Sequence, residues 1–128
     1  MKGLKALAAA VLVSGLLATA APATAGAAAY QHYVGCGHSL AHAKKWHRSH
    51  VCAKNQVKGA FFKSLDGTVT YTVCVRFPSG KNLCAQAQEA EQGTLYVNKI
   101  TSAIPGRHVV SWFVKGKKVG SWAFRVEG

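Results

Sequence analysis

The segment from Thr68 to Phe77 alternates strictly between apolar and polar side chains, which is the pattern of a β-strand with one buried face. Its apolar positions are Val69, Tyr71, Val73, Val75 and Phe77. The triplet Pro78-Ser79-Gly80 follows, and it suits a three-residue hairpin turn because proline fits the first turn position and glycine the left-handed one. We therefore expect a returning strand in which Lys81 pairs with Phe77.

This register places Cys74 directly opposite Cys84, although neither cysteine was used to choose it. The alternation of the ladder makes them a non-hydrogen-bonded pair, with Cα atoms about 4.5 Å apart, which lies within the ~4.4–6.8 Å range that a disulfide spans. The sequence therefore predicts a Cys74–Cys84 disulfide. It also extends the returning strand to Ala87, which would face Tyr71.

A local helix is the alternative for the second half of this hairpin, because 83–92 is rich in good helix formers. We favour the strand, since the turn, the apolar face and the cysteine pair agree on one register. Residues 88–92 then form a polar connection that ends at Gly93.

Further strands are expected at Val57–Ser64, Thr94–Ile100, Arg107–Val114 and Val119–Val126. The last two flank a lysine-rich stretch and form a second hairpin. A two-residue turn at Lys115-Gly116 and a longer loop give opposite pairings of Trp112 with Trp122, so the pattern leaves this register open, although both tryptophans are expected in the core. About six short strands separated by turns predict one antiparallel β-sandwich.

The first 25 residues follow a different pattern. Lys2 and Lys5 precede an apolar run at 6–17, and small residues with several A-x-A sites come next. This is typical of a secretory signal peptide, and the run is shorter than the ~20 residues that span a bilayer. We expect cleavage after Ala25, or alternatively after Ala29; a retained anchor or a buried helix is the competing interpretation.

Removal of residues 1–25 leaves 103 residues, enough for one domain and too few for two. The number of Lys and Arg falls from 16 to 14 against four acids, so the mature net charge is +10. Export to an oxidising compartment and an even number of cysteines predict two disulfides. Because Cys74–Cys84 uses two cysteines, the remaining pair is Cys36–Cys52.

Residues 26–56 differ in composition from residues 57–128, to which we assign the sandwich. The first segment holds five of the six histidines, four lysines and arginines, and no acid. Cys36–Cys52 would close it as a loop or as a short helix that Ser39 caps and that runs to His50. We expect a solvated basic segment in which Trp46 is exposed.

The part of the chain from Val69 onward resembles small secreted immunoglobulin-like domains of actinobacteria. The matching motifs are Y-T-V-C-V-R-F-P-S-G and the closing G-R-H-V-V-S-W-F-V-K-G-K-K-V-G-S-W-A-F-R-V. The resemblance implies an all-β immunoglobulin-like sandwich, a fold that usually binds or spaces other molecules. The inter-sheet disulfide of antibody domains is expected to be absent, since Cys74–Cys84 would lie within one hairpin.

The histidine-rich segment offers one candidate metal site. His38 and His42 are spaced for one helical face, and neutral imidazole commonly ligates zinc, copper or nickel. No carboxylate lies in the segment to orient the rings, so we expect no metal ion and no other cofactor. A pH-sensitive patch is the further alternative, because histidines that protonate near pH 6 would add charge to this segment.

The basic charge favours an anionic partner such as a wall polymer, an anionic lipid or a polysaccharide. Nucleic acid is a weaker case, because no recognised nucleic-acid-binding motif accompanies the charge. The candidate anion-binding residues are Lys44, Lys45, Arg48, Lys54, Lys115, Lys117 and Lys118. The competing interpretation is that these lysines keep the protein soluble and protect its sheet edges.

Enzymatic activity is not expected. The four carboxylates of the mature chain lie in a turn, a polar connection and the terminus, and they are Asp66, Glu89, Glu91 and Glu127. No nucleophile motif such as G-x-S-x-G occurs, so no catalytic residue is predicted. The sequence favours a secreted, non-catalytic binding module. A cationic antimicrobial or toxin-like protein is the first alternative, and a secreted inhibitor that presents the Cys36–Cys52 loop is the second.

Overall fold

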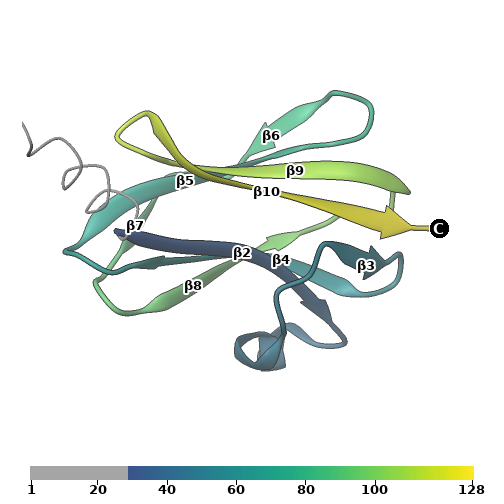
Figure 1. Cartoon of the computed structure of the whole chain (residues 1–128), viewed down its shortest axis with the longest axis horizontal. Coiled ribbons are helices and arrows are strands. Elements are labelled where there is room, and N and C mark those ends of the chain that lie inside the picture. The colour runs from purple at the N-terminus through teal and green to yellow at the C-terminus, as the bar shows by residue number, and fades with distance from the viewer. Residues whose placement is uncertain (1–28) are drawn as a thin grey trace, which may run out of the picture.

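The computed structural model describes residues 29–128, and the expected signal peptide at 1–25 lies outside this range. The described residues form two β-sheets that pack face to face, with a short 3-10 helix at Leu40–Lys45 (Figure 1). Among them, no helix is long and apolar enough to cross a membrane. The all-β class predicted from the alternating pattern is confirmed.

The smaller sheet has three antiparallel strands in the order β2 (Tyr30–Gly37), β4 (Val57–Ser64) and β8 (Leu95–Ile100). The larger sheet has six strands. Its main path is β3 (Val51–Ala53), β10 (Lys117–Glu127), β9 (Gly106–Val114), β5 (Val69–Arg76) and β6 (Asn82–Cys84), and β7 (Gln88–Ala90) also pairs with β5.

The order of the strands is that of an immunoglobulin-like sandwich. The first described strand, β2, is an edge strand of the smaller sheet, in which β4 lies between it and β8, while β5, β9 and β10 form the centre of the opposite sheet. Every ladder is antiparallel except the one between β3 and β10, which is parallel. This division of the strands corresponds to the two sheets of the immunoglobulin fold.

The core lies between the sheets and is built from every second residue of the longer strands. On β9 the buried side chains are His108, Val110, Trp112 and Val114, and they alternate with more exposed ones. Trp112 is fully buried, and the stacked rings of Phe62 and Tyr71, whose centroids are 4.2 Å apart, join the two sheets. Burying each of these large side chains stabilises the fold by roughly 1.5–3 kcal/mol.

The first hairpin has the predicted turn and the predicted register beside it. The Phe77 N–H donates to the Lys81 carbonyl oxygen at 2.8 Å, and Gly80 has a φ of +94°. Cys74 pairs with Cys84 in the ladder. Further from the turn the prediction is wrong, because Tyr71 pairs with Gln88 and not with Ala87.

The cause of this shift is one extra residue between β6 and β7. Had the first register continued, Glu89 would oppose Val69 on the inner face of the sheet. With the extra residue, Ala90 opposes Val69 and is fully buried, while Glu89 opposes Thr70 and is exposed. The shift therefore keeps a carboxylate out of the core, and it turns part of the expected polar connection at 88–92 into a strand.

The register of the second hairpin, which the sequence left open, is decided by a two-residue turn followed by a bulge. Lys115 and Gly116 have φ values of 53° and 78°, as a type I′ turn requires. The bulge falls between Lys118 and Gly120, so that Trp112 opposes Gly120 and Trp122 opposes Val110. Without this extra residue, Trp122, Phe124 and Val126 would all face outward.

The expectation that the sandwich begins at residue 57 needs correction. β2 pairs with β4 along its whole length, and β3 pairs with the last residues of β10. The basic segment is therefore part of both sheets rather than a solvated loop in front of them. The expected helix is only the 3-10 turn at Leu40–Lys45, and Ser39 caps it by accepting the Ala41 N–H at 3.2 Å.

The structure contains the disulfides Cys36–Cys52 and Cys74–Cys84, the two pairs that the sequence predicts. Their roles differ. Cys74–Cys84 lies within one hairpin, whereas Cys36–Cys52 joins β2 to β3 and therefore links the two sheets. An inter-sheet disulfide is therefore present at a place other than that of the antibody-type bridge, because the chain crosses between the sheets within the segment that Cys36–Cys52 closes.

Two basic side chains are buried between the sheets. His108 is fully buried, with Nε2 at 2.8 Å from the Ser102 hydroxyl and Nδ1 at 3.1 Å from the Gly106 carbonyl oxygen. Lys58 donates to the carbonyl oxygens of Lys54 and Gln56. Burial lowers the pKa of His108 below 6.5, and the charge of Lys58 lowers it further against the opposing effect of the Gly106 hydrogen bond.

Removing the inter-sheet disulfide should destabilise the protein substantially. The bridge joins cysteines 16 residues apart, so the C36A/C52A variant should lose about 3 kcal/mol of unfolding free energy in the chain-entropy model. Urea denaturation followed by tryptophan fluorescence measures this loss. Adding reductant to a C74A/C84A variant, which retains only the inter-sheet bridge, should give a similar loss; an unchanged midpoint would contradict the prediction.

Stability should fall in mild acid because of His108. In the unfolded chain His108 binds a proton near pH 6.5, but in the folded chain it does so only at lower pH. The free energy of unfolding is therefore highest above pH 6.5 and declines below it. A buried histidine of this kind lowers the free energy of unfolding by up to about 1.4 kcal/mol for each pH unit below 6.5, until the pH reaches its pKa in the folded state. In urea titrations from pH 7 to 5, H108Q should show a shallower decline, whereas H38Q, at an exposed histidine, should follow the wild type.

Candidate functional site

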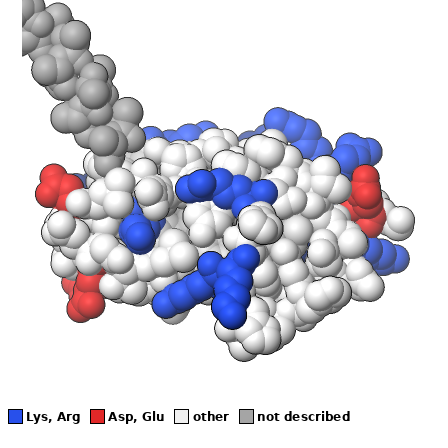
Figure 2. Space-filling view, turned by 60° about the horizontal axis from the view of Figure 1, so that its bottom comes forward, with Lys and Arg blue, Asp and Glu red and all other residues white. Residues whose placement is uncertain are grey.

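Acidic side chains lie at the ends of the molecule. On the side shown in Figure 2, in which the bottom of Figure 1 is turned toward the viewer, separate groups of Lys and Arg lie across the middle and near one end, and Asp and Glu occur at the two ends. The four acids of residues 29–128 are exposed, and they are Asp66 in the β4–β5 turn, Glu89 on β7, Glu91 beyond it and Glu127 at the C-terminal end. A face with few acids can present its cations to an anionic partner.

The outer face of the six-stranded sheet carries a row of cations. Arg76 on β5 and Arg107 on β9 alternate with buried residues and therefore point away from the core. Lys118 on β10 opposes Phe113 of β9, and Lys115 lies in the adjoining turn. Sheet register thus collects on one face basic residues that are far apart in the sequence.

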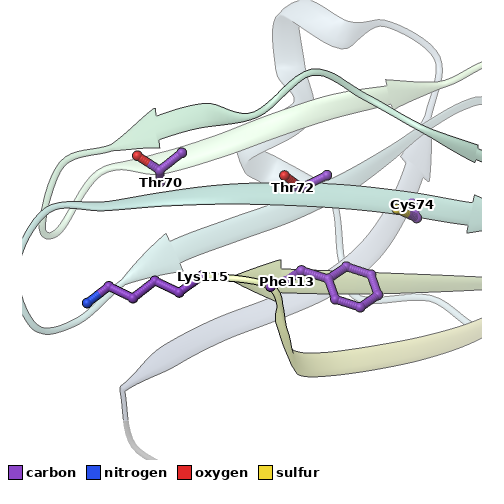
Figure 3. A pocket seen from close by; sticks show the side chains of 6 residues that line it. Thr70, Thr72, Cys74, Phe113 and Lys115 are labelled. Carbon is purple, nitrogen blue, oxygen red and sulfur yellow. The ribbon is translucent and has the colours of Figure 1, made fainter.

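Three adjoining cavities run along this face. The first, of about 510 Å³, includes Thr70, Thr72, Phe113 and Lys115 (Figure 3). The second, of about 380 Å³, shares Phe113 with the first and adds Arg76, Arg107 and Lys118. The third, of about 410 Å³, shares both arginines with the second. Because neighbouring cavities share lining residues, they form one shallow channel, which we call the sheet groove.

The sheet groove is long and has an apolar floor. Its cations extend from Arg107 to Lys115, about 27 Å at the usual rise of a β-strand. The Phe113 ring and the Cys74–Cys84 disulfide lie between the arginines and Lys115. Glu89 on β7 opposes Thr70, so one carboxylate lies on the same outer face near the Lys115 end of the groove. The groove therefore matches an extended anionic chain better than a single small anion.

The structure brings together only some of the predicted anion-binding residues. Lys115 and Lys118 line the sheet groove, whereas Lys117 is exposed outside it. The others lie elsewhere: Lys44 and Lys45 are exposed on the 3-10 helix, Arg48 lies at a cavity on the opposite outer face, and Lys54 is exposed before β4.

Sequence reasoning missed Arg76 and Arg107 as members of this site. The period-two pattern had already placed Arg76 on the polar face of its strand, together with Cys74. The sequence did not indicate which strand lies beside β5. In the structure β5 pairs with β9, so that Arg76 opposes Val109, two residues from Arg107. That pairing joins distant segments and is not encoded in local spacing.

Trp46, expected to be exposed, is partly buried on the outer face of the three-stranded sheet. Its ring packs edge-on against Phe61, with centroids 6.0 Å apart. It lies over a depression that glycines leave in the adjacent strands, since a Cβ added at Gly37 would overlap the indole ring. The surrounding charges suggested a solvated position, but the glycine-lined depression could be found only from the strand pairing.

The histidines of the basic segment do not form one cluster. His32 faces the core, 5.0 Å from Trp112, and burial together with the charge of Arg48 lowers its pKa. His50 stacks on Trp122 at 4.2 Å. The candidate metal ligands His38 and His42 are exposed, and within residues 29–128 no three His, Cys, Asp or Glu side chains are grouped to hold a metal ion.

Comparison with known proteins gives resemblance at the level of the fold. No protein-family model matches the chain, and no curated protein matches it. It is similar to an immunoglobulin-like protein from Pseudomonas aeruginosa, with 12% identity and a TM-score of 0.46 over 76% of this chain and 92% of that chain. It is also similar to a Pseudomonas fluorescens alkylpurine DNA glycosylase bound to DNA containing an abasic site analog, with 16% identity and a TM-score of 0.40. That match covers 79% of this chain and 31% of the glycosylase, and neither likeness assigns a ligand to this chain.

Proposed function

We propose that this protein is a secreted, non-catalytic binding module whose partner is an extended anionic polymer, such as a wall polymer or an acidic polysaccharide. The observation that carries the proposal is the row formed by Arg76, Arg107, Lys118 and Lys115 along the sheet groove. Cations arranged in a row bind successive charges of a chain and release its counterions, which favours binding at low salt.

The shape of the site supports a chain rather than a small molecule. A site for a small ligand is usually a concave cavity that encloses most of its occupant. The sheet groove is instead shallow and continuous along the strands, and its floor includes Phe113 and the Cys74–Cys84 disulfide. A flexible polymer can lie along such a surface with its charges on the basic side chains and its apolar groups on the floor.

Export belongs to the same proposal. The leader pattern of residues 1–25 directs secretion, and the two disulfides of the described residues suit an oxidising compartment. We place signal cleavage after Ala25, or alternatively after Ala29. The second position directly precedes β2, so either product would retain every described strand of the sandwich.

Salt-dependent binding to dextran sulfate tests the proposal, with uncharged dextran as the reference polymer. The R76Q/R107Q/K118Q variant should bind more weakly at low salt. The plot of its log affinity against log salt concentration should also be less steep, by about 2, at about 0.7 for each lost contact. The K44Q/K45Q/K54Q variant removes the same charge from outside the groove and should retain the wild-type slope. Isothermal titration calorimetry at several salt concentrations measures both.

Equal slopes for the two triple variants would show that net charge, and not the groove, causes binding. Wild-type affinity for dextran equal to that for dextran sulfate would reject the anionic partner. Leakage of anionic phospholipid vesicles at the same protein concentration would reject the binding module in favour of an antimicrobial protein.

A further inference from the structure

A second basic site lies on the opposite outer face of the sandwich, over the three-stranded sheet. There the chain between β2 and β3 folds across the sheet, and Trp46, Tyr33 and Phe61 form part of a second hydrophobic cluster. Tyr33 and Phe61 are directly paired on β2 and β4, and their rings stack with centroids 4.6 Å apart and planes within 9°. This pair gives the face a rigid aromatic surface.

Arg48 is positioned by that surface. Its guanidinium carbon lies 4.7 Å from the centroid of the Tyr33 ring, so that guanidinium, Tyr33 and Phe61 form three successive layers. The backbone of Arg48 also forms a bridge to Gly35 of β2. The positive guanidinium lies over the negative face of the aromatic ring, and because it is already held beside the sheet it loses less entropy on binding.

A cavity of about 260 Å³ adjoins the stacked guanidinium. Gln31 and Lys63, which also line it, oppose each other on β2 and β4, so their Cβ atoms lie about 5 Å apart. The full lining is Gln31, Tyr33, Trp46, His47, Arg48, Lys63 and Leu95. Two of these side chains are cations and a third carries an amide that can donate, while the lining contains no carboxylate.

The charge of Arg48 acts on its neighbours without a nearby acid to neutralise it. It contributes to the lowered pKa of His32, although burial of that ring is the larger cause. Burial raises the pKa of Tyr33, and Arg48 opposes this rise. The middle of the side shown in Figure 2 carries Lys and Arg, with acids only at its ends.

We propose that Arg48, Lys63 and Gln31 form a compact site for one tetrahedral oxyanion, a sulfate or a phosphate group. The guanidinium would donate two hydrogen bonds, while the ammonium and the amide would donate from the adjacent strands. The site differs from the sheet groove because it is a small cavity with one pre-positioned arginine. It does not depend on polymer binding, and its occupant is either a free anion or an ester carried on a sugar.

Backbone amide chemical shifts of the mature chain, followed by NMR, test the site with sodium sulfate, glucose 6-sulfate and glucose. Sulfate or glucose 6-sulfate should shift the amides of Gln31, Arg48 and Lys63 saturably, whereas glucose should not. R48Q should raise the apparent Kd about tenfold or more, because charge-assisted hydrogen bonds are lost. K54Q, which removes one positive charge from an exposed position outside both sites, should leave the titration unchanged.

R48K separates a positioned guanidinium from charge alone, since lysine retains the charge but lacks the planar fork. Weaker binding by R48K, with an unchanged Trp46 indole N–H resonance to show that the segment is still docked, supports the site. Wild-type affinity in R48K or R48Q, or shifts spread over both faces, overturns it. Equal affinity for sulfate and glucose 6-sulfate identifies a free anion as sufficient, and binding of glucose 6-sulfate alone identifies a sugar-borne ester.

The R76Q/R107Q/K118Q variant tests the oxyanion site separately from the proposed binding of a polymer in the sheet groove. It should lose salt-dependent binding to dextran sulfate and still titrate with sodium sulfate at the wild-type Kd. If it loses both together, the two faces are not independent sites and the present proposal is rejected.

Discussion

The crossing of the chain from one sheet to the other, between β2 and β3, is the constraint on which the other features depend. Cys36–Cys52 holds the two strands across that crossing, and the segment between them has to run over the outside of the three-stranded sheet. Glycines in β2 and β4 leave room for Trp46 there. Once that indole is seated, Arg48 follows two residues later and lies on the ring of Tyr33.

Two single-residue irregularities decide which side chains reach the solvent. The one between β6 and β7 turns Glu89 outward and Ala90 inward, and the bulge after Lys118 turns Trp122 and its alternate neighbours toward the core. Lys118 precedes the bulge and stays on the outer face beside Phe113. The bulge therefore lets Lys118 lie on the groove face while Trp122 faces the core, whereas the irregularity before β7 places Glu89 on the outer face, opposite Thr70, because a shift of one residue exchanges the two faces of a strand.

The two outer faces carry positive charge in different ways. On the six-stranded sheet the cations are spaced along the groove, and they come from different strands and from a turn. On the three-stranded sheet one guanidinium is fixed by aromatic stacking beside a lysine and an amide. The first arrangement favours a partner with repeated charges, and the second favours one compact charged group, so net charge alone describes neither site.

The sequence by itself determined the local features: the alternation of 69–77, the turn at 78–80, the Cys74–Cys84 pair and the all-β class. These depend on residues close in the chain, where strand period and turn geometry act directly. Tertiary structure alone decided that Cys36–Cys52 links two sheets, that Trp46 is partly buried and that Arg76 and Arg107 line the same cavity. Each of these depends on contact between distant segments, and that contact is selected by burial of the whole core rather than by spacing along the chain.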